Sequence, residues 1–220
     1  MTLSRRVIGM VKATHFGPTV LVVSITFILS ITQLSAVKSL EIALAILCGQ
    51  LVVGWTNELV DHRRDGEAGR SKKPLVNGSV TRKQLQIGVG VALTAAIVLS
   101  FVGPLGVRGG WLHLLGLGSA TVYNFWAKAT WLSPVPYAIS FGALPWAIYS
   151  AAHKSPVPWL YMDFAVISVA FHFLNVIKDL SWDLVQGIKG APQRLGKRGS
   201  VVTAAILVLA AVLLGIGRPS

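Results

Sequence analysis

The sequence predicts an all-α membrane protein, a polytopic transmembrane bundle of about seven helices that forms a single domain over residues 1–220. Apolar residues make up 53% of the chain and charged residues only 13%, a composition that excludes an ordinary soluble domain. Long apolar runs recur, each close to the roughly 20 residues that cross a bilayer. We expect spans at about 17–36, 40–56, 84–103, 111–126, 135–152, 159–177 and 200–217.

Several local signals support these spans in chain order. The first span follows a basic N-terminal segment and is too long for the apolar part of a signal peptide, so we interpret it as an uncleaved helix. Glycine and proline interrupt helices, and Gly103-Pro104 and Pro156-Val157-Pro158 separate later spans. Tryptophans near span ends are typical of residues that anchor helices at the membrane surface. These are Trp55, Trp111, Trp126, Trp131 and Trp159.

The net charge of +12 is distributed unevenly. Sixteen of the 20 Lys and Arg residues lie in the N-terminal segment, at Lys128, or in two loops at 57–83 and 178–199. Because cytoplasmic loops carry the excess of Lys and Arg, this pattern predicts a multi-pass plasma-membrane protein with a cytoplasmic N-terminus and cytoplasmic 57–83 and 178–199 loops. The same pattern argues against a nucleic-acid partner. The other side holds Lys38, Arg108, Lys154 and Arg218.

Acidic residues gather in two clusters at the ends of apolar helices. A carboxylate at the centre of a membrane helix costs about 2.5–3.5 kcal/mol, so acids in such helices are usually functional. Only eight residues of the chain are acidic, and six of them fall in or beside the clusters. The six are Glu58, Asp61, Asp65, Glu67, Asp179 and Asp183.

The spacing of these residues favours a metal site. Asn57, Asp61 and Asp65 follow i, i+4, i+8 spacing and share one helix face, and Asp179 and Asp183 repeat the i, i+4 step. Oxygen ligands of this kind suit Mg²⁺, which also takes phosphate oxygens and water. Two such helices facing each other would hold a diphosphate through metal ions. The alternative is a set of helix-end acids paired with basic neighbours on a solvated face. Those neighbours are Arg63, Arg64 and Lys178.

The two clusters carry a resemblance to a known family. The segment NELVDHRRD (57–65) resembles the N-D-x-x-D-x-x-x-D motif of the UbiA superfamily of intramembrane prenyltransferases, with Glu58 in place of the second-position Asp. Lys73-Pro74-Leu75 and Gly78 resemble the loop that follows this motif. The segment DLSWDLVQGIKGAPQRLG (179–196) is similar to the second motif, D-x-x-x-D and a Gly-rich basic stretch. The segment from Tyr123 to Lys128 is similar to the family's Tyr-to-Lys segment after the fourth helix.

The resemblance implies a helical bundle around a central cavity that is open laterally to lipid. Mg²⁺ held by the two motifs would bind the diphosphate of a prenyl donor, whose ionisation gives an allylic carbocation that alkylates an aromatic or other lipophilic acceptor. The implied metal ligands are Asn57, Asp61, Asp65, Asp179 and Asp183, with Asp61 and Asp179 most important for catalysis. The implied diphosphate-binding residues are Lys12, Arg70, Lys73, Tyr123, Lys128, Lys189 and Arg194.

These expectations give a first prediction about metal. Binding of a prenyl diphosphate should require Mg²⁺, and Asp61→Ala or Asp179→Ala should abolish it without unfolding the protein, because removing one ligand leaves the diphosphate charge under-compensated.

Other functions share the same motifs. Phosphoribosyl transfer to a polyprenyl phosphate and cyclisation of a prenyl diphosphate also use a diphosphate and a metal, and a non-catalytic lipid-binding or assembly subunit is the alternative from another class. Family members usually have nine spans, and this chain is expected to have seven. We therefore expect a homo-oligomer or a partner subunit to cover the flank between the first and last spans. The expected contact residues are Ala204, Ala205, Ala210, Ala211 and Gly215.

Overall fold

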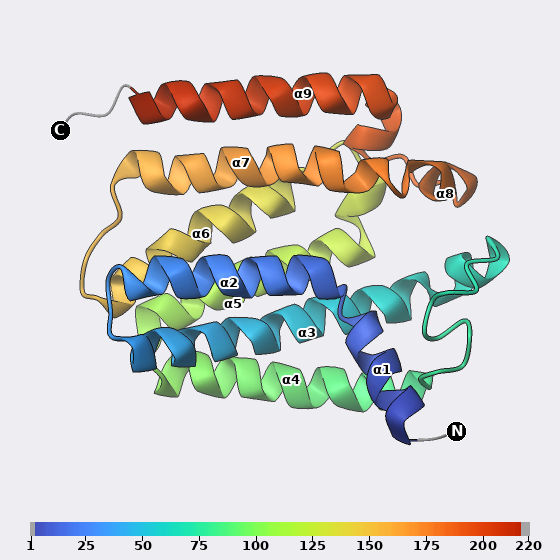
Figure 1. Ribbon diagram of the computed structural model, residues 1–220, viewed down its shortest axis with the longest axis horizontal. Coiled ribbons are helices and arrows are strands. Elements are labelled where there is room, and N and C mark those ends of the chain that lie inside the picture. Colours follow the sequence, from blue (N-terminus) through green and yellow to red (C-terminus); the bar gives the residue numbers. More distant parts are fainter. Residues whose placement is uncertain (1–2, 217–220) are drawn as a thin grey trace.

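The structure is a computed structural model that describes residues 3–216, and every regular element in that range is helical (Figure 1). The α-helices are α1 (Leu3–Ala13), α2 (Phe16–Ile31), α3 (Ala36–Glu67), α4 (Arg82–Val102), α5 (Gly106–Phe125), α6 (Val135–Ala151), α7 (Pro158–Ile177), α8 (Leu180–Val185) and α9 (Ala191–Ile216). A 3₁₀ turn, η1 (Ala127–Ala129), follows α5. The predicted all-α fold is confirmed.

The long helices run back and forth between two ends of the bundle (Figure 1). Helix α3 packs against α2, α4 and α5, and α6 lies between α5 and α7, with α9 packed on the far side of α7. The end of α3, the 68–81 loop, η1 and α8 all lie at one end, to the right in Figure 1. The two acidic motifs therefore meet at the same end of the bundle, as the membrane topology required.

The predicted number of seven spans stays a prediction. Each expected span falls on one helix, but only α3, α4, α7 and α9 are individually long and apolar enough to cross a membrane. The pair α1 and α2, bent by 65°, qualifies together as a fifth candidate within residues 3–216. The last expected span ended at position 217, and Arg218 was assigned to the outer side; both lie outside the described residues.

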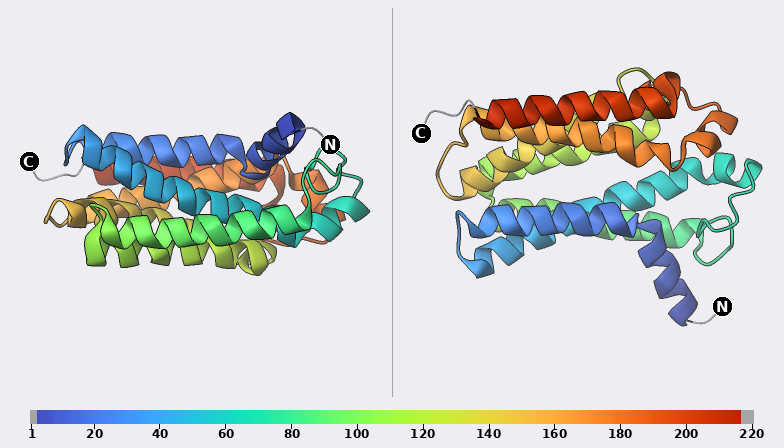
Figure 2. Two further views of the ribbon diagram at one scale, coloured as in Figure 1. Left: turned by 90° about the horizontal axis from the view of Figure 1, so that it is seen from below. Right: turned by 45° about the horizontal axis from the view of Figure 1, so that its top comes forward.

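Three helix boundaries differ from the sequence expectation. Helix α3 continues beyond the expected end of the span at 56 to Glu67, so the first acidic motif lies on helical turns, as its i, i+4, i+8 spacing predicted. Helix α9 starts at Ala191 and is interrupted at Gly196, whose φ of 67° is the left-handed conformation that glycine adopts readily. The basic N-terminal segment forms α1, an amphipathic helix that leaves the bundle at an angle (Figure 2).

Helix ends and the core follow from ordinary sequence rules. Thr81 and Gln84 form a reciprocal capping box at the start of α4, and Ser35 caps α3 by accepting from the backbone of Lys38. The main apolar core includes Ile42 and Ile148, both fully buried. Many other large apolar side chains are exposed on outer helix faces, as expected for a surface in contact with lipid.

The small residues of the last span are partly used within the molecule. Ala204 and Ala211 are buried, and Ala204 belongs to the apolar cluster that α9 forms with Ala170 and Phe173 of α7. These two alanines already pack inside the bundle, so the five-residue surface expected to mediate oligomer contacts is not free as a whole. The oligomeric state stays a prediction.

Gly54 permits a close contact that positions the bend between α1 and α2. A Cβ atom at this position would lie 2.6 Å from the backbone carbonyl oxygen of Thr14, a distance that backbone atoms cannot tolerate. The indole Nε1 of Trp55 donates to the carbonyl oxygen of Met10 at 3.0 Å, which holds α1 against the same part of α3. Residues 13–15 are thereby placed over the first acidic motif.

Replacing Gly54 by alanine should therefore destabilise this end of the protein. We expect Gly54→Ala to lower the free energy of unfolding by about 1–3 kcal/mol, because overpacking forces backbone shifts. The matched control is Gly90→Ala in α4, where an added Cβ meets no atom within 4 Å. Thermal denaturation of both variants in the same detergent measures the effect. Equal stability of the two variants would contradict the close-contact interpretation.

Candidate active site

A cavity of about 1020 Å³ opens at the polar end of the bundle and continues between the helices. Its walls come from α2, α3, α5, α6 and α7, together with the 68–81 loop and the segment around α8. The outer part carries the acidic motifs and basic side chains. The inner part is mainly apolar, with Val22, Ile46, Leu117, Phe141 and Leu144 among its lining residues.

The first motif is held by a network of amide and imidazole groups. Asn57 Nδ2 donates to Asp61 Oδ2 at 2.9 Å and lies 3.3 Å from Asn124 Oδ1. Asn57 Oδ1 lies 2.7 Å from His15 Nε2, which comes from the bend between α1 and α2. Asn124 in turn donates to the carbonyl oxygen of Val53 at 2.8 Å. The orientation of Asn57 is thus fixed from three sides.

Asp61 is buried and paired with two cations. Its Oδ1 accepts from Arg64 at 2.6 Å and from the ammonium of Lys128 in a short contact. Lys128 is itself buried in η1, with 7% of its surface exposed. Burial lowers the pKa of Lys128, and the neighbouring Asp61 carboxylate opposes that shift. With Arg64, the two cations and the Asp61 carboxylate leave one net positive charge beside the first motif.

Glu58 organises the loop that follows the motif. Its Oε1 accepts from the backbone N–H of Leu75 at 2.9 Å, and its Oε2 lies 3.3 Å from Lys73 Nζ. The residue is 2% exposed, so these contacts satisfy a carboxylate that would otherwise be costly to bury. Glu58 is therefore committed to holding the 68–81 loop and Lys73 over the cavity. The longer arm of glutamate at this position reaches the loop backbone.

Arg70 connects the two acidic motifs. Its NH1 lies 3.3 Å from Asp65 Oδ1 and its NH2 lies 2.8 Å from Asp179 Oδ1. Asp65 also contacts Lys73 at 3.4 Å and accepts from Gln186 Nε2 at 3.0 Å. Carboxylates that are more than 100 residues apart in sequence thus share one guanidinium group.

Asp183 completes the second motif on α8. Gln193 Nε2 donates to Asp183 Oδ2 at 2.7 Å, and the backbone N–H of Asp183 donates to the carbonyl oxygen of Asp179. Burial raises the pKa of the Asp183 carboxyl group, the hydrogen bond from Gln193 opposes the shift, and the charge of Asp179 adds to it. A cation beside Asp183 would favour its ionised form.

The burial of the acids in the first motif argues against a solvated helix face for that motif, whereas Asp179 and Asp183 are half-buried. Asp61 and Asp65 are 8% and 1% exposed, and Glu58 is equally hidden. Their partners are Arg64, Arg70, Lys73 and Lys128. Four of the five predicted metal-binding residues line the cavity, whereas Asp65 lies behind it against Arg70 and Lys73. Both acidic motifs therefore contribute side chains to one cavity, and the metal-binding role of these residues stays a prediction.

The side chains of the two motifs are of the kinds that bind Mg²⁺, but their oxygen atoms do not converge on one point. Within residues 3–216, no three His, Cys, Asp or Glu side chains lie close enough together to hold a metal ion. The space between the two motifs is bridged by Arg70. Asp65 Oδ2 is buried and makes no hydrogen bond, and its cationic neighbour is Lys73 Nζ at 3.4 Å. Carboxylate and amide oxygens are the ligands that Mg²⁺ prefers, and the residues fit it chemically.

The predicted diphosphate-binding residues divide into two groups. Lys12, Arg70, Lys73, Tyr123 and Lys128 line the cavity, as expected. Lys189 and Arg194 are not among the described residues that line it. Arg194 Nε donates to the Lys189 carbonyl oxygen at 2.7 Å, and its guanidinium group stacks 5.1 Å from the ring centre of Trp131. These contacts hold Arg194 away from the cavity.

Several residues of the site lie in the segments 123–128 and 179–196 but were not predicted as site residues. Asn124, Gln186 and Gln193 orient the carboxylates, but amides in apolar or loop segments look alike before the fold brings them together. Deeper in the cavity, Gln50 and His113 also line the wall. His113 Nδ1 bonds Ser100 Oγ at 2.7 Å, and the space for its ring exists because residue 49 is glycine.

Comparisons with known proteins identify the family of this helical bundle, in which two acidic motifs lie over one partly apolar cavity. The UbiA prenyltransferase family matches residues 16–219, so the chain belongs to this family. A 4-hydroxybenzoate octaprenyltransferase of Pectobacterium carotovorum subsp. carotovorum (strain PC1) is 26% identical over 176 residues, which cover 74% of this chain and 60% of that protein. The chain thus spans about three fifths of the length of this curated relative.

Solved structures share the fold at low sequence identity. A UbiA homolog from Archaeoglobus fulgidus bound to DMAPP and Mg²⁺ has a TM-score of 0.80 and 14% identity, covering 93% of this chain and 75% of its own. An apo UbiA homolog from Aeropyrum pernix K1 has a TM-score of 0.71 and 19% identity, covering 100% and 82%. These similarities show that the bundle has the UbiA transmembrane fold.

Proposed function

We propose that the protein is an intramembrane prenyltransferase that moves a prenyl group from a prenyl diphosphate to a lipophilic acceptor. The observation that carries the proposal is the meeting of both acidic motifs, through Arg70, at the mouth of a cavity whose inner part is apolar. This arrangement suits a molecule with an anionic head and a hydrocarbon tail. A solved relative described as bound to DMAPP and Mg²⁺ supports the same assignment.

The basic side chains of the cavity mouth would bind and orient the diphosphate. Lys128 and Arg70 each contact a motif carboxylate, and Lys73 approaches from the 68–81 loop, so positive charge surrounds the space between the motifs. Such preorganised cations stabilise negative charge as it develops on a leaving group. Mg²⁺, held by Asn57, Asp61, Asp65, Asp179 and Asp183, would neutralise the diphosphate and make it a better leaving group.

The apolar inner cavity would hold the isoprenoid tail and exclude water. Val22, Leu117 and Phe141 come from three different helices and leave a hydrocarbon-lined space between them. Exclusion of water protects a carbocation from being quenched before the acceptor attacks. Tyr123 lines the cavity, and its ring packs edge-on against Tyr137 at 5.3 Å and His172 at 5.6 Å, so aromatic rings are available to stabilise a carbocation of a donor bound in this way.

Turnover with defined substrates tests the proposal. The purified protein is incubated with a prenyl diphosphate, Mg²⁺ and a lipid extract from the producing cells, and both diphosphate release and new prenylated lipids are measured. We expect release that depends on Mg²⁺, with a lipid product heavier by one prenyl group. Diphosphate release with a cyclised hydrocarbon, or a product carrying phosphoribose, would select the other reactions. Binding of lipid without any turnover would contradict the proposal that the protein is an enzyme.

We also propose that the active site lies on the cytoplasmic side of the plasma membrane, because Lys and Arg residues are concentrated in the loops at this end of the bundle. On a background with Cys48→Ala, a cysteine at exposed Ser71 should react with an impermeant thiol reagent only from the cytoplasm. A cysteine at exposed Ser155, at the opposite end of the bundle, should react only from outside. The reverse labelling pattern would overturn the orientation inferred from Lys and Arg.

A further inference from the structure

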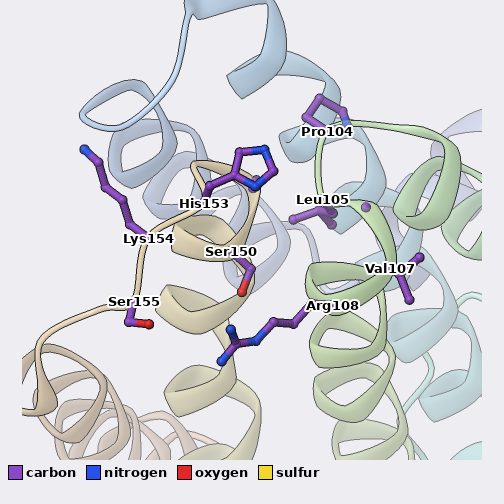
Figure 3. A pocket seen from close by; sticks show the side chains of 10 residues that line it. Pro104, Leu105, Val107, Arg108, Ser150, His153, Lys154 and Ser155 are labelled. Carbon is purple, nitrogen blue, oxygen red and sulfur yellow. The ribbon is translucent and has the colours of Figure 1, made fainter.

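A second cavity lies at the end of the bundle opposite the acidic motifs, between the start of α5 and the end of α6 (Figure 3). Its volume is about 400 Å³. Figure 3 shows Arg108 extending from α5 toward α6, where the Ser150 hydroxyl lies, while His153 and Lys154 come from the loop after α6. The proposed prenyl-transfer reaction uses none of these residues.

Positive charge dominates this second cavity. Arg108, His153 and Lys154 line it, and none of the described residues that line it is acidic. Lys154 Nζ donates to the neutral amide of Gln33 at 3.2 Å, which leaves its charge uncompensated. The Arg108 guanidinium group lies 5.3 Å from the ring centre of Trp146, a cation–π contact that holds its plane without neutralising it. Two of the four basic residues predicted for this side of the membrane thus meet at one cavity.

The N-terminus of α5 adds to the positive electrostatic potential of this cavity. Gly106, Val107 and Arg108 form the first turn of α5 and line the cavity. The N–H of Gly106 donates to the carbonyl oxygen of Gly103 at 3.2 Å, and Leu105 provides no side-chain cap for the turn. The N–H groups of a first turn have no partner within the helix, and the helix dipole makes this end positive. Anions bind at such positions.

A buried hydroxyl gives an independent indication of a ligand. Ser150 lines the cavity, and its Oγ is buried with no hydrogen-bond partner among the described residues. A buried hydroxyl without a partner costs free energy, so it is expected to bond to whatever occupies the space. Ser155 offers a second hydroxyl at the rim.

We propose that this cavity binds a phosphate anion, supplied by the head group of an anionic phospholipid at the membrane surface opposite the active site. Phosphate oxygens accept from guanidinium, ammonium, hydroxyl and backbone N–H groups, which are the groups gathered here. Val107 and Val102 beside the cavity are 70% and 83% exposed, so acyl chains would continue along apolar helix surface. The charge-assisted contacts of Arg108 and Lys154 would hold the phosphate of such a head group.

Native mass spectrometry with added lipid tests the site. The wild-type protein is mixed with phosphatidylglycerol or with phosphatidylcholine, and retained lipid is counted. We expect preferential retention of phosphatidylglycerol, reduced about tenfold by the double variant Arg108→Gln/Lys154→Gln. The matched control is Arg82→Gln/Lys83→Gln, which removes the same charge from exposed positions at the other end of the bundle. The control should retain the lipid as the wild type does.

Two further measurements separate the sources of the anion and the role of the cavity. Inorganic phosphate that raises the denaturation temperature of the wild type and the control, but not of the pocket variant, would support the site with free phosphate as its ligand. Ser150→Ala changes no charge and should also weaken binding. Equal binding by the wild type, the pocket variant and Ser150→Ala would show diffuse attraction to a positive surface and would overturn the proposal.

Discussion

The variant Asp179→Asn should lower prenyl-transfer activity by about 100- to 1,000-fold while the protein stays folded. Asp179 lines the cavity and shares Arg70 with Asp65, so the substitution removes one charged oxygen ligand from the centre of the site. Losses of this size follow the removal of one group that stabilises charge in a transition state. The side chain is 33% exposed, and Arg70 keeps Asp65 as a partner, so stability should change by less than about 1 kcal/mol.

The control for this prediction is Glu67→Gln. Glu67 is the last residue of the helix that carries the first motif, but its side chain is 67% exposed. Within residues 3–216 it forms an ion pair with Arg63 at 3.6 Å. Activity of Glu67→Gln should equal that of the wild type. An Asp179→Asn protein with wild-type activity, or a Glu67→Gln protein that is equally impaired, would remove the second motif from the reaction.

The second large effect concerns stability. Asp61→Ala should lower the free energy of unfolding by about 3–5 kcal/mol, because it leaves the ammonium group of buried Lys128 without its counter-charge. The sequence alone led us to expect Asp61→Ala to lose function without unfolding. The structure changes that expectation for Asp61, because Lys128, 67 residues away in the sequence, is buried against it.

A double variant separates the two consequences of this substitution. Asp61→Ala/Lys128→Met removes both charges, so most of the lost stability should return, because an apolar replacement of a buried pair is often neutral. Activity should not return, since both groups face the cavity. Thermal denaturation in detergent and diphosphate release measure the two effects. A double variant as unstable as Asp61→Ala would show that the pair does not explain the stability.

The sequence predicted the helical fold because apolar runs of membrane length have few alternatives in lipid. It missed α1, since an 11-residue amphipathic helix carries too short an apolar pattern to be seen beside the first span. It placed the start of the last helix nine residues too late, at 200 instead of Ala191, because Gln193, Arg194 and Lys197 hide the helical pattern there. How far α3 and α9 extend beyond their apolar segments depends on tertiary packing, which cannot be seen in the sequence.

The site was predicted best where one helix face carries the whole pattern. Asn57 and Asp61 could be placed together from their spacing alone, and the structure joins them by a hydrogen bond. Arg194 was predicted to contact the diphosphate because of its charge alone. In the structure its guanidinium group stacks on Trp131 and donates to the carbonyl oxygen of Lys189. Contacts across the fold, such as Arg70 with Asp179, depend on the meeting of distant segments.

Equilibrium binding of radiolabelled geranyl diphosphate tests the central claim most directly. The purified protein is dialysed against the ligand with Mg²⁺ or with EDTA, and the Asp179→Asn variant is treated in the same way. We predict saturable binding with Mg²⁺ that is lost in EDTA and strongly weakened in the variant, because the motif carboxylates need a metal to hold a diphosphate. Binding of unchanged affinity in EDTA by both proteins would contradict a metal-dependent diphosphate site.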